Sequence, residues 1–578
     1  MSADSASHMT GSRLAAFFDT ASVAVYCVLI ALVFATFADY GTSWDEFEHS
    51  RYGDDIVGYF ASGLSAEAVP SHHQNYGGGY NLAAAVFSGW VPHPRHVANH
   101  LFTAILGLIG LLGTWRLGRL LGGAAGGLLA LVLLASLPAY YGHMFNNPKD
   151  LPFAVGYVWV LYYLARLIEA GPRAPLRLWG ALGVAMGLAM MVRVGGLLCI
   201  AYLLLVVAAQ WGIALRQERD MRAAASLGYS LAWRTLAAST VAWALMVLPW
   251  PAAHRAPWSM PFDALSGFSE HGFTARTLFR GVRVSPNPPP PDYLPGYFLV
   301  QLPDVLWCAL ALGLVLLLWM VSRPDGRGRL REWRSLALGL LALSVLFPIV
   351  YAIARRATVY DGFRHFLFVL PPLCVLAAVA VTATARVLAA RSKPFAYALT
   401  VLVAFGIGLT VADMARLHPY EYAYFNRASG GLEAAADRYE TDYYAHSFKE
   451  LSERLVAHLW TNEPERYLRG EYRVLGCGIM DYLMTPHLPA NFLVAREPVL
   501  LWRPHDFDVY VTYRRGSCPG RRTHLPRVVE VARDGVVLNT ARDMREDARA
   551  VARPETEPEA GEAPSPNQDL EPGEGHAD

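Results

Sequence analysis

Long stretches without charge constrain the fold of this 578-residue chain more than any other feature. Several of them approach the ~20 residues that an α-helix needs to cross a bilayer. They lie at residues 21–38, 97–115, 122–141, 152–168, 176–192, 194–213, 235–250, 300–322, 335–354, 366–385 and 395–412. Hydrophobic residues make up 54% of the chain and charged residues only 17%. We therefore predict an α-helical polytopic membrane protein with about eleven transmembrane helices.

Basic residues favour one orientation of these helices. Every short loop on one side is rich in arginine or lysine, as in Arg323–Arg334 (RPDGRGRLREWR). The positive-inside rule makes that side cytoplasmic, together with residues 1–20. The loops 39–95, 140–151 and 251–299 then lie outside. This count reads residues 176–213 as a hairpin with Arg193 at its tip; one long bent helix would reverse every later span.

The chain changes character after its last apolar stretch. We divide it into a transmembrane domain at 21–413, a small extracytoplasmic α/β domain at 414–544 and a disordered acidic tail at 545–578. Residues 446–460 show helical periodicity, and Arg533-Asp534-Gly535 indicates a β-hairpin. Further strands are expected at 472–475, 507–513 and 528–532.

An acidic pair follows the first apolar stretch. Asp45 and Glu46 lie in the first outer loop, at what we expect to be an exposed membrane boundary. A lipid-borne substrate would present its head group there, so the pair suggests an enzyme acting on a lipid-linked substrate. A solvated acidic loop is the alternative.

Basic groups are expected at the same face. Lys149 and Asp150 precede the span at 152–168, and Arg193 interrupts an apolar run, which makes it a functional candidate. Arg364 and His365 precede the span at 366–385. Such cations suit a phosphate or diphosphate. For Lys149 and Asp150 the alternative is a snorkelling lysine followed by a helix N-cap.

Metal, redox and nucleic-acid roles receive less support. Five histidines follow the first span, but they lack a compact ligand spacing, so we expect no metal and leave a divalent cation open. They are His72, His73, His93, His96 and His100. Cys477 and Cys518 are the two cysteines of the C-terminal domain and could form a disulfide in an oxidising compartment. A net charge of +1 gives no hint of a nucleic-acid partner.

Residues 20–385 resemble the GT-C membrane glycosyltransferases. The similar group is the bacterial family-39-like one, with protein O-mannosyltransferases and lipid A aminoarabinose transferases. The resemblance rests on Asp45-Glu46 in the first outer loop, Asn146-Asn-Pro-Lys149-Asp150 in the second, the Arg193 hairpin, and the segments 360–368 and 418–426. The C-terminal domain departs from it, because it does not look like the β-trefoil inserts of eukaryotic O-mannosyltransferases.

The resemblance implies an inverting transferase in the inner membrane. It would move a sugar from a polyprenyl-phosphate donor to a cell-envelope acceptor, which is a lipid, glycan or protein. Asp45 would be the general base, with Glu46 and Asp150 orienting the acceptor or the base. The donor phosphate would be bound by Lys149, Arg193, Arg364 and His365. A secondary transporter and a non-catalytic envelope scaffold are the alternatives.

Overall fold

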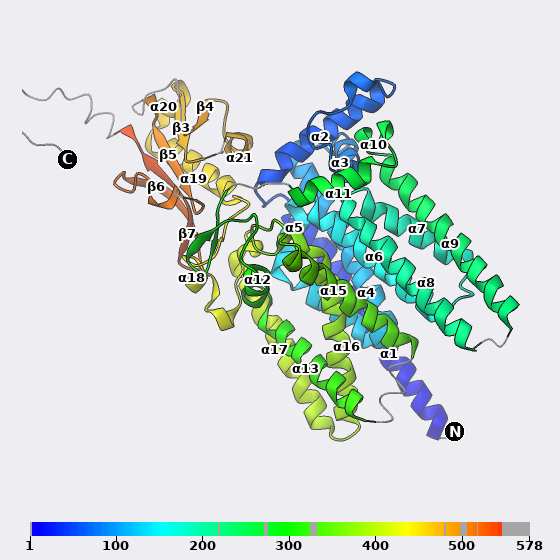
Figure 1. The fold of residues 1–578 in the computed structure, drawn as a ribbon. Helices are drawn as coiled ribbons and strands as arrows, with labels where there is room; N and C mark the ends of the chain where they lie inside the picture. Colours follow the sequence, from blue (N-terminus) through cyan, green and yellow to red (C-terminus); the bar gives the residue numbers. More distant parts are fainter. Residues whose placement is uncertain are drawn as a thin grey trace, which may run out of the picture.

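The computed structural model describes residues 3–217, 220–270, 275–323, 332–478, 481–497, 506–516 and 518–545. Within these ranges, long helices form a bundle and a small sheet domain lies at one end of it (Figure 1). The predicted helical membrane architecture with a C-terminal α/β domain is confirmed. The predicted acidic tail lies outside the described residues, except for Arg545.

The long helices coincide with the apolar stretches of the sequence. They are α1 (Ala3–Thr36), α4 (Arg95–Ala135), α6 (Asp150–Ala170), α7 (Leu176–Met190), α8 (Leu198–Gln217), α9 (Met221–Val247), α13 (Asp304–Ser322), α15 (Trp333–Ala354), α16 (Leu370–Ala389) and α17 (Lys393–Leu417). In the described ranges, eight helical segments have the length and apolarity needed to cross a membrane. Helix α6 is central, and the Tyr157 hydroxyl on it donates to the carbonyl of Ser344 on α15 at 2.8 Å.

Helix α4 reverses direction within its 41 residues, and this explains part of the difference between eight and about eleven. Gly123 has φ 77°, a conformation that glycine adopts without steric cost. A Cβ placed on Gly118 would lie 2.6 Å from the Cβ of Ala130, so the two arms pack against each other. The arms correspond to the predicted spans 97–115 and 122–141.

The predicted span 300–322 begins later than expected. Helix α12 (Tyr293–Gln301) includes the first two residues of the expected span, and α13 starts at Asp304. The break falls at Leu302, which is extended with φ −81° and ψ 137°. A residue that precedes proline disfavours the helical conformation, and Pro303 follows here.

Short helices gather at the end of the bundle that also bears the sheet domain. They are α2 (Trp44–Ala61), η1 (Ala66–Ala68), α3 (Gly79–Ser88), α5 (Pro138–Asn146), η2 (Val194–Leu197), α10 (Pro251–Arg255), α11 (Met260–Glu270) and η3 (Arg364–Val369). Strands β1 (Thr277–Phe279) and β2 (Val282–Val284) form an antiparallel hairpin. The segment 140–151, read from the sequence as a loop, is therefore mostly helix α5 followed by a tight turn.

The C-terminal domain is a five-stranded mixed sheet in the order β4-β3-β5-β7-β6. Its strands are β3 (Tyr472–Gly476), β4 (Phe492–Arg496), β5 (Val509–Tyr513), β6 (Arg527–Arg533) and β7 (Val536–Asp543). The predicted hairpin joins β6 to β7, with positive φ at Asp534 and Gly535 as its two-residue turn requires. Strand β4 was not predicted.

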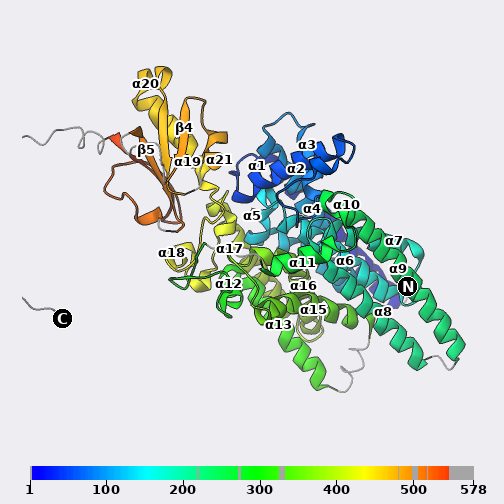
Figure 2. The same ribbon diagram turned by 45° about the horizontal axis from the view of Figure 1, so that its top comes forward.

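Helices of the C-terminal part complete the fold. They are η4 (Glu421–Ala423), η5 (Arg427–Ser429), α18 (Gly431–Ala435), α19 (Ser447–Asn462), α20 (Pro464–Arg469), α21 (Asp481–Met484), η6 (Thr485–His487) and η8 (Cys518–Gly520). Helix α19 matches the predicted helix 446–460. Figures 1 and 2 show the sheet domain and α21 on the side of α2, while the last turn of α8 and the first turn of α9 lie at the opposite end of the bundle.

Candidate functional site

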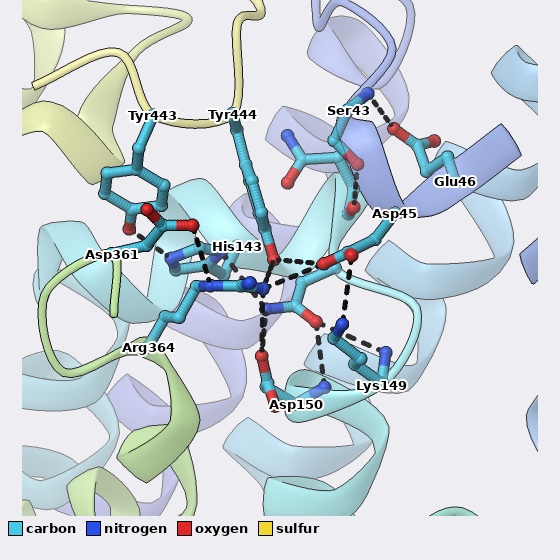
Figure 3. A network of polar contacts seen from close by, with 12 residues as sticks. Ser43, Asp45, Glu46, His143, Lys149, Asp150, Asp361, Arg364, Tyr443 and Tyr444 are labelled. Atoms are coloured by element: carbon cyan, nitrogen blue, oxygen red, sulfur yellow. Dashed lines mark hydrogen bonds and ion pairs between the residues drawn. The ribbon is translucent and has the colours of Figure 1, made fainter. Parts of the chain in front are cut away.

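Asp45 is held by three side chains from distant parts of the chain (Figure 3). The Lys149 ammonium donates to Oδ1 at 2.9 Å, and the Arg364 guanidinium donates to Oδ2 at 2.8 Å. The Tyr444 hydroxyl also reaches Oδ2, at 3.2 Å. These groups come from α2, the turn before α6, the start of η3 and the segment before α19. The structure thus brings Asp45, Lys149 and Arg364 into direct contact.

Asp150 occupies the neighbouring position in the same network. Its Oδ1 pairs with the Arg193 guanidinium, and its Oδ2 lies 3.6 Å from Nη1 of Arg364. The Asn147 amide donates to Oδ2 at 3.1 Å. Arg364 therefore lies between the two carboxylates, Asp45 and Asp150, and interacts with both.

The turn that presents Lys149 is shaped by Asn147. Its side-chain oxygen accepts from the backbone N–H groups of Asp150 at 2.8 Å and of Lys149 at 3.2 Å. A side-chain oxygen in this role satisfies amides that a helix start leaves without partners. Asn147, and not Asp150, thus caps the start of α6, and the Asp150 carboxylate is left to face the cations.

Arg193 reaches the network from the connection between α7 and α8. The chain leaves α7 at Met190 and passes through Arg193, which is extended with φ −140°, into η2. The predicted hairpin is present, and Arg193 lies at its tip. Its side chain is 20% exposed, so it remains partly accessible to solvent.

Asp361 and Arg515 extend the network into the C-terminal domain. Arg515 Nη2 lies 2.7 Å from Asp361 Oδ1, and Arg364 Nε lies 3.5 Å from Asp361 Oδ2. Arg515 also donates to the carbonyl of Tyr443 at 2.8 Å. Neither Asp361 nor Arg515 was a candidate from the sequence. Asp361 lay inside the segment 360–368 that supported the family resemblance, and that position was the available signal.

Among the described residues, the ion pairs that connect to Asp45, directly or through a shared partner, contain more cations than carboxylates. The members are Lys149, Arg193, Arg364 and Arg515 on one side and Asp45, Asp150 and Asp361 on the other. The group therefore has an excess of one positive charge. His49 and His73 lie beside Lys149, but burial lowers the pKa of His49 to about 3 and that of His73 to about 4. Both rings are neutral near pH 7.

The electrostatics of this network favour its charged forms. Burial by itself raises the pKa of the Asp45 carboxyl, but the charges of Lys149 and Arg364 outweigh it and hold that pKa well below its usual range. Burial opposes the charge on Lys149, yet the Asp45 carboxylate raises the pKa of the ammonium above its ordinary value. Asp45 is thus a carboxylate near pH 7, and a weak base while both cations hold it.

The expected exposure of Asp45 is wrong. Its side chain is only 19% exposed and takes part in two ion pairs, to Lys149 and Arg364. The C-terminal segment around Tyr444 packs over the side of Asp45 that we expected to face solvent. A substitution at Asp45 therefore disturbs the folded protein more than one at a free surface carboxylate.

Glu46 points away from Asp45. Consecutive helical residues are about 100° apart around the axis, because a turn takes ~3.6 residues. Glu46 Oε2 accepts from the backbone N–H of Ser43 at 2.6 Å, and Oε1 lies 2.7 Å from Nε2 of the buried His100. The structure therefore gives Glu46 a place in the N-terminal cap of α2, away from the cation network. His365 follows Arg364 and packs edge-on against Tyr360, with ring centroids 4.7 Å apart.

The two cysteines of the C-terminal domain form a disulfide. Cys477 and Cys518 are joined with a Cα–Cα distance of 5.7 Å. Cys477 directly follows β3 and Cys518 begins η8, three residues after Arg515. The bond therefore anchors the chain close to Arg515, which pairs with Asp361. In the described ranges, three or more His, Cys, Asp or Glu side chains are nowhere grouped to hold a metal ion.

An apolar groove lies between α2, α3, α4 and the ends of α7 and α9. Its volume is about 470 Å³. The lining residues are Phe60, Gly79, Leu82, Ala83, Val86, Phe87, Trp90, Phe102, Met191, Leu245, Leu248 and Pro249. Met191 on its wall lies two residues before Arg193, and the Gly79 N–H donates to the Met191 carbonyl at 3.1 Å. The lining is apolar, and Met191 is the lining residue nearest in the chain to the cation network.

Comparison with known families supports the resemblance. The family model for dolichyl-phosphate-mannose-protein mannosyltransferase matches residues 91–248. This match confirms the expected similarity to GT-C membrane glycosyltransferases. It covers less than half of the chain and includes Lys149, Asp150 and Arg193. No curated protein sequence matches this chain.

Solved structures with a similar fold include a bacterial and an archaeal protein. ArnT from Cupriavidus metallidurans bound to undecaprenyl phosphate is 16% identical, with a TM-score of 0.48 over 90% of this chain and 97% of that chain. Its apo state gives 16% identity and a TM-score of 0.46, over 90% and 98%. The archaeal oligosaccharyltransferase AglB from Archaeoglobus fulgidus, in complex with an inhibitory peptide and a dolichol-phosphate, is 12% identical with a TM-score of 0.43, over 82% and 64%.

Proposed function

We propose that this protein is an inverting membrane glycosyltransferase that takes a sugar from a polyprenyl-phosphate donor. The observation that supports it best is the Asp45 carboxylate held directly by Lys149 and Arg364, inside a network with one surplus positive charge. The family matched by residues 91–248 is described by a donor of this class, a dolichyl-phosphate sugar.

The cations suit the phosphate of such a donor. A sugar joined to polyprenyl phosphate is a phosphodiester with one negative charge. When the bond between the anomeric carbon and the phosphate oxygen breaks, polyprenyl phosphate leaves with a second negative charge. Lys149, Arg193 and Arg364 would bind the first charge and stabilise the second, because donors placed where charge develops lower the barrier. No proton has to reach the leaving oxygen.

Binding of the same phosphate would release Asp45 from Lys149 and so allow it to act as a base. While Lys149 and Arg364 hold Asp45, its pKa is too low for efficient proton transfer. A phosphate that draws Lys149 toward itself removes one of these partners and adds a negative charge nearby, and both changes raise the pKa of Asp45. The carboxylate then takes the proton of an acceptor hydroxyl as that oxygen attacks the anomeric carbon. Asp150 holds Arg193 and Arg364 in place for the phosphate.

The apolar groove suits the polyprenyl chain. It is lined by aromatic and aliphatic side chains, among them Met191, which precedes Arg193 by two residues in the chain. A donor would lie with its isoprenoid units in the groove and its phosphate at the cations. Burial of such units stabilises a complex by roughly 25 cal/mol per Å² of apolar surface removed from water.

The orientation follows from the basic loops. We place the network and the sheet domain at the outer face of the inner membrane, with the α8–α9 connection in the cytoplasm. Cysteines introduced at the exposed positions Asp54 and Glu453 should react with an impermeant maleimide from outside, and one at Arg222 should not. The opposite labelling pattern contradicts this orientation.

A transfer assay tests the proposed function. The protein, purified and placed in vesicles, is mixed with an envelope extract from cells that lack it, as the source of donor and acceptor. Mass spectrometry follows the conversion of the sugar-bearing lipid to free polyprenyl phosphate, which forms whatever the acceptor is.

Variants of two aspartates distinguish an enzyme from the alternatives, a secondary transporter and an envelope scaffold. Asp45→Asn should lower conversion about 10²–10⁴-fold, the contribution of a positioned base. Asp55→Asn is the matched control, since Asp55 lies on the same helix, is 39% exposed and pairs with His72. If the wild-type protein converts no donor, or Asp45→Asn converts it at the normal rate, the interpretation as a secondary transporter or an envelope scaffold is favoured over the interpretation as an enzyme.

A further inference from the structure

The two oxygens of Asp45 are held differently. Among the residues that the structure describes, Oδ1 has one hydrogen-bond partner, the Lys149 ammonium at 2.9 Å. Oδ2 has two, because Arg364 donates to it at 2.8 Å and the Tyr444 hydroxyl at 3.2 Å. Arg364 Nη1 also donates to the Tyr444 hydroxyl at 2.8 Å. Tyr444 thus both donates to the carboxylate and accepts from the cation that holds it (Figure 3).

The segment that presents Tyr444 is fixed by its own hydrogen bonds. The buried Asp442 carboxylate accepts from the Tyr422 hydroxyl, the Ser447 hydroxyl and, at 3.1 Å, the His446 N–H. Ala445 between them has φ 63°, a left-handed conformation that an alanine adopts only where its surroundings impose it. The Tyr444 hydroxyl therefore has a defined position, and is not a mobile surface group.

Contact with the membrane domain locks the segment on its other side. A Cβ on Gly41 would lie 2.4 Å from the His446 carbonyl oxygen, so the chain before α2 and the chain before α19 touch through their backbones. Ser43 at the start of α2 donates to the Asn146 carbonyl at 3.0 Å. The backbone that carries Asp45 and the backbone that carries Tyr444 are thereby held as one unit.

We propose that Tyr444 is a positioning residue for the catalytic carboxylate and that Asp45 Oδ1 is the atom that accepts the proton. This inference rests on the proposed function. When the donor phosphate draws Lys149 away, Oδ1 loses its partner, while Oδ2 keeps the Tyr444 hydroxyl. The acceptor proton passes to Oδ1, the acceptor oxygen bonds to the anomeric carbon, and polyprenyl phosphate leaves. Tyr444 keeps its own proton throughout.

Tyr443 provides a matched control. It is the neighbouring residue, it is buried like Tyr444, and its hydroxyl bonds to Nε2 of His143 at 2.9 Å instead of to Asp45. Tyr444→Phe and Tyr443→Phe each remove one buried hydroxyl from the same segment. A general loss of packing or stability would affect both, whereas a role in holding the base belongs to Tyr444 alone.

The kinetic test uses the donor-conversion assay. Tyr444→Phe should lower kcat about 10- to 100-fold, the worth of one hydrogen bond to a charged group. The KM for donor should stay within about twofold of the wild type, because the phosphate ligands are intact. Tyr443→Phe should keep a near-normal kcat. Equal loss of kcat in both variants, or a loss confined to donor KM, overturns the proposal.

The pH dependence distinguishes positioning from a structural role. A hydroxyl that donates to a carboxylate stabilises its charged form and lowers its pKa. The acid limb of the kcat profile should therefore move to higher pH in Tyr444→Phe. With 3-fluorotyrosine at position 444, a stronger donor of the same shape, it should move to lower pH. An unmoved limb in the fluorinated protein overturns the proposal even if Tyr444→Phe fails to fold.

Failure of this inference can be told from failure of the proposed function. If Asp45→Asn is inactive but Tyr444→Phe behaves as Tyr443→Phe does, Asp45 remains the base and Tyr444 is not its positioning residue. If Asp45→Asn converts the donor normally, the proposed base itself is wrong.

Discussion

Asp45→Asn should bind polyprenyl phosphate more tightly than the wild-type protein while transferring sugar about 10²–10⁴-fold more slowly. In the resting network Asp45 occupies the cations that the phosphate needs, at 2.9 Å from Lys149 and 2.8 Å from Arg364. The asparagine keeps the shape of the side chain but removes its charge. Lys149 and Arg364 then lack their carboxylate partner and are available to the ligand.

The expected gain in affinity follows from Coulomb's law. Two unit charges about 4 Å apart interact by roughly 4 kcal/mol at an effective dielectric constant of ~20. Asp45 is partly solvated, so we discount this to about 1.4–2.8 kcal/mol, which corresponds to a 10- to 100-fold lower Kd. The same substitution leaves two cations without their partner, so the melting temperature of the ligand-free protein should fall.

Titration of the protein in nanodiscs with polyprenyl phosphate, followed by tryptophan fluorescence, measures this Kd. Asp55→Asn should leave the Kd unchanged, because its partner His72 lies outside the cation network. A Kd for Asp45→Asn that is unchanged or higher than that of the wild type would refute the idea that Asp45 and the phosphate compete for the same cations.

Three further predictions concern the same site. Lys149→Ala and Arg193→Ala should each raise the Kd for polyprenyl phosphate about 10-fold or more, as loss of a charge-assisted hydrogen bond implies, and an unchanged Kd in both would exclude them as phosphate ligands. Because Lys149 depresses the pKa of Asp45 in the free protein, the acid limb of kcat/KM should lie at lower pH than that of kcat, and coinciding limbs in the two profiles would argue against release of the base by the donor. Cys477 and Cys518 should be recovered as one linked peptide by mass spectrometry of unreduced protein. Treatment with a reductant should lower kcat, because Arg515 is then no longer held in position. Two free thiols in protein from its native membrane would count against the bond.

Much of the helical architecture could be predicted, because the thickness of a bilayer fixes the length of an apolar helix. The exceptions have local causes. Pro303 shortens the helix expected from residue 300. At Gly123 the chain turns back within α4, so this one helix contains two of the expected spans. Strand β4 was missed because Phe492–Arg496 is a run of only five residues, although Pro489 and Asn491 before it are turn residues.

The candidate site was predictable only as a set of separate residues. Unusual charges in an apolar chain pointed to Asp45, Lys149, Asp150, Arg193 and Arg364, since such groups are costly near a membrane and are retained for a reason. Their pairing was not predictable, because it depends on which loops the helix packing brings together.

Tyr444 shows why the remainder was missed. The chain has 29 tyrosines, and nothing in the sequence around Tyr444 distinguishes it. Its contact with Asp45 spans 399 positions of the chain. Glu46 shows the opposite error, because adjacency in sequence suggested a shared role while the geometry of a helix directs its side chain to Ser43 and His100.

The central claim is that the donor phosphate takes Lys149 away from Asp45. A structure of the protein with polyprenyl phosphate bound tests it most directly, through the distance from Lys149 Nζ to Asp45 Oδ1, which is 2.9 Å without ligand. We predict that this distance increases beyond ~4 Å, the limit of an ion pair, with Nζ bonded to a phosphate oxygen instead. A bound phosphate that leaves the Lys149–Asp45 pair intact would contradict the account.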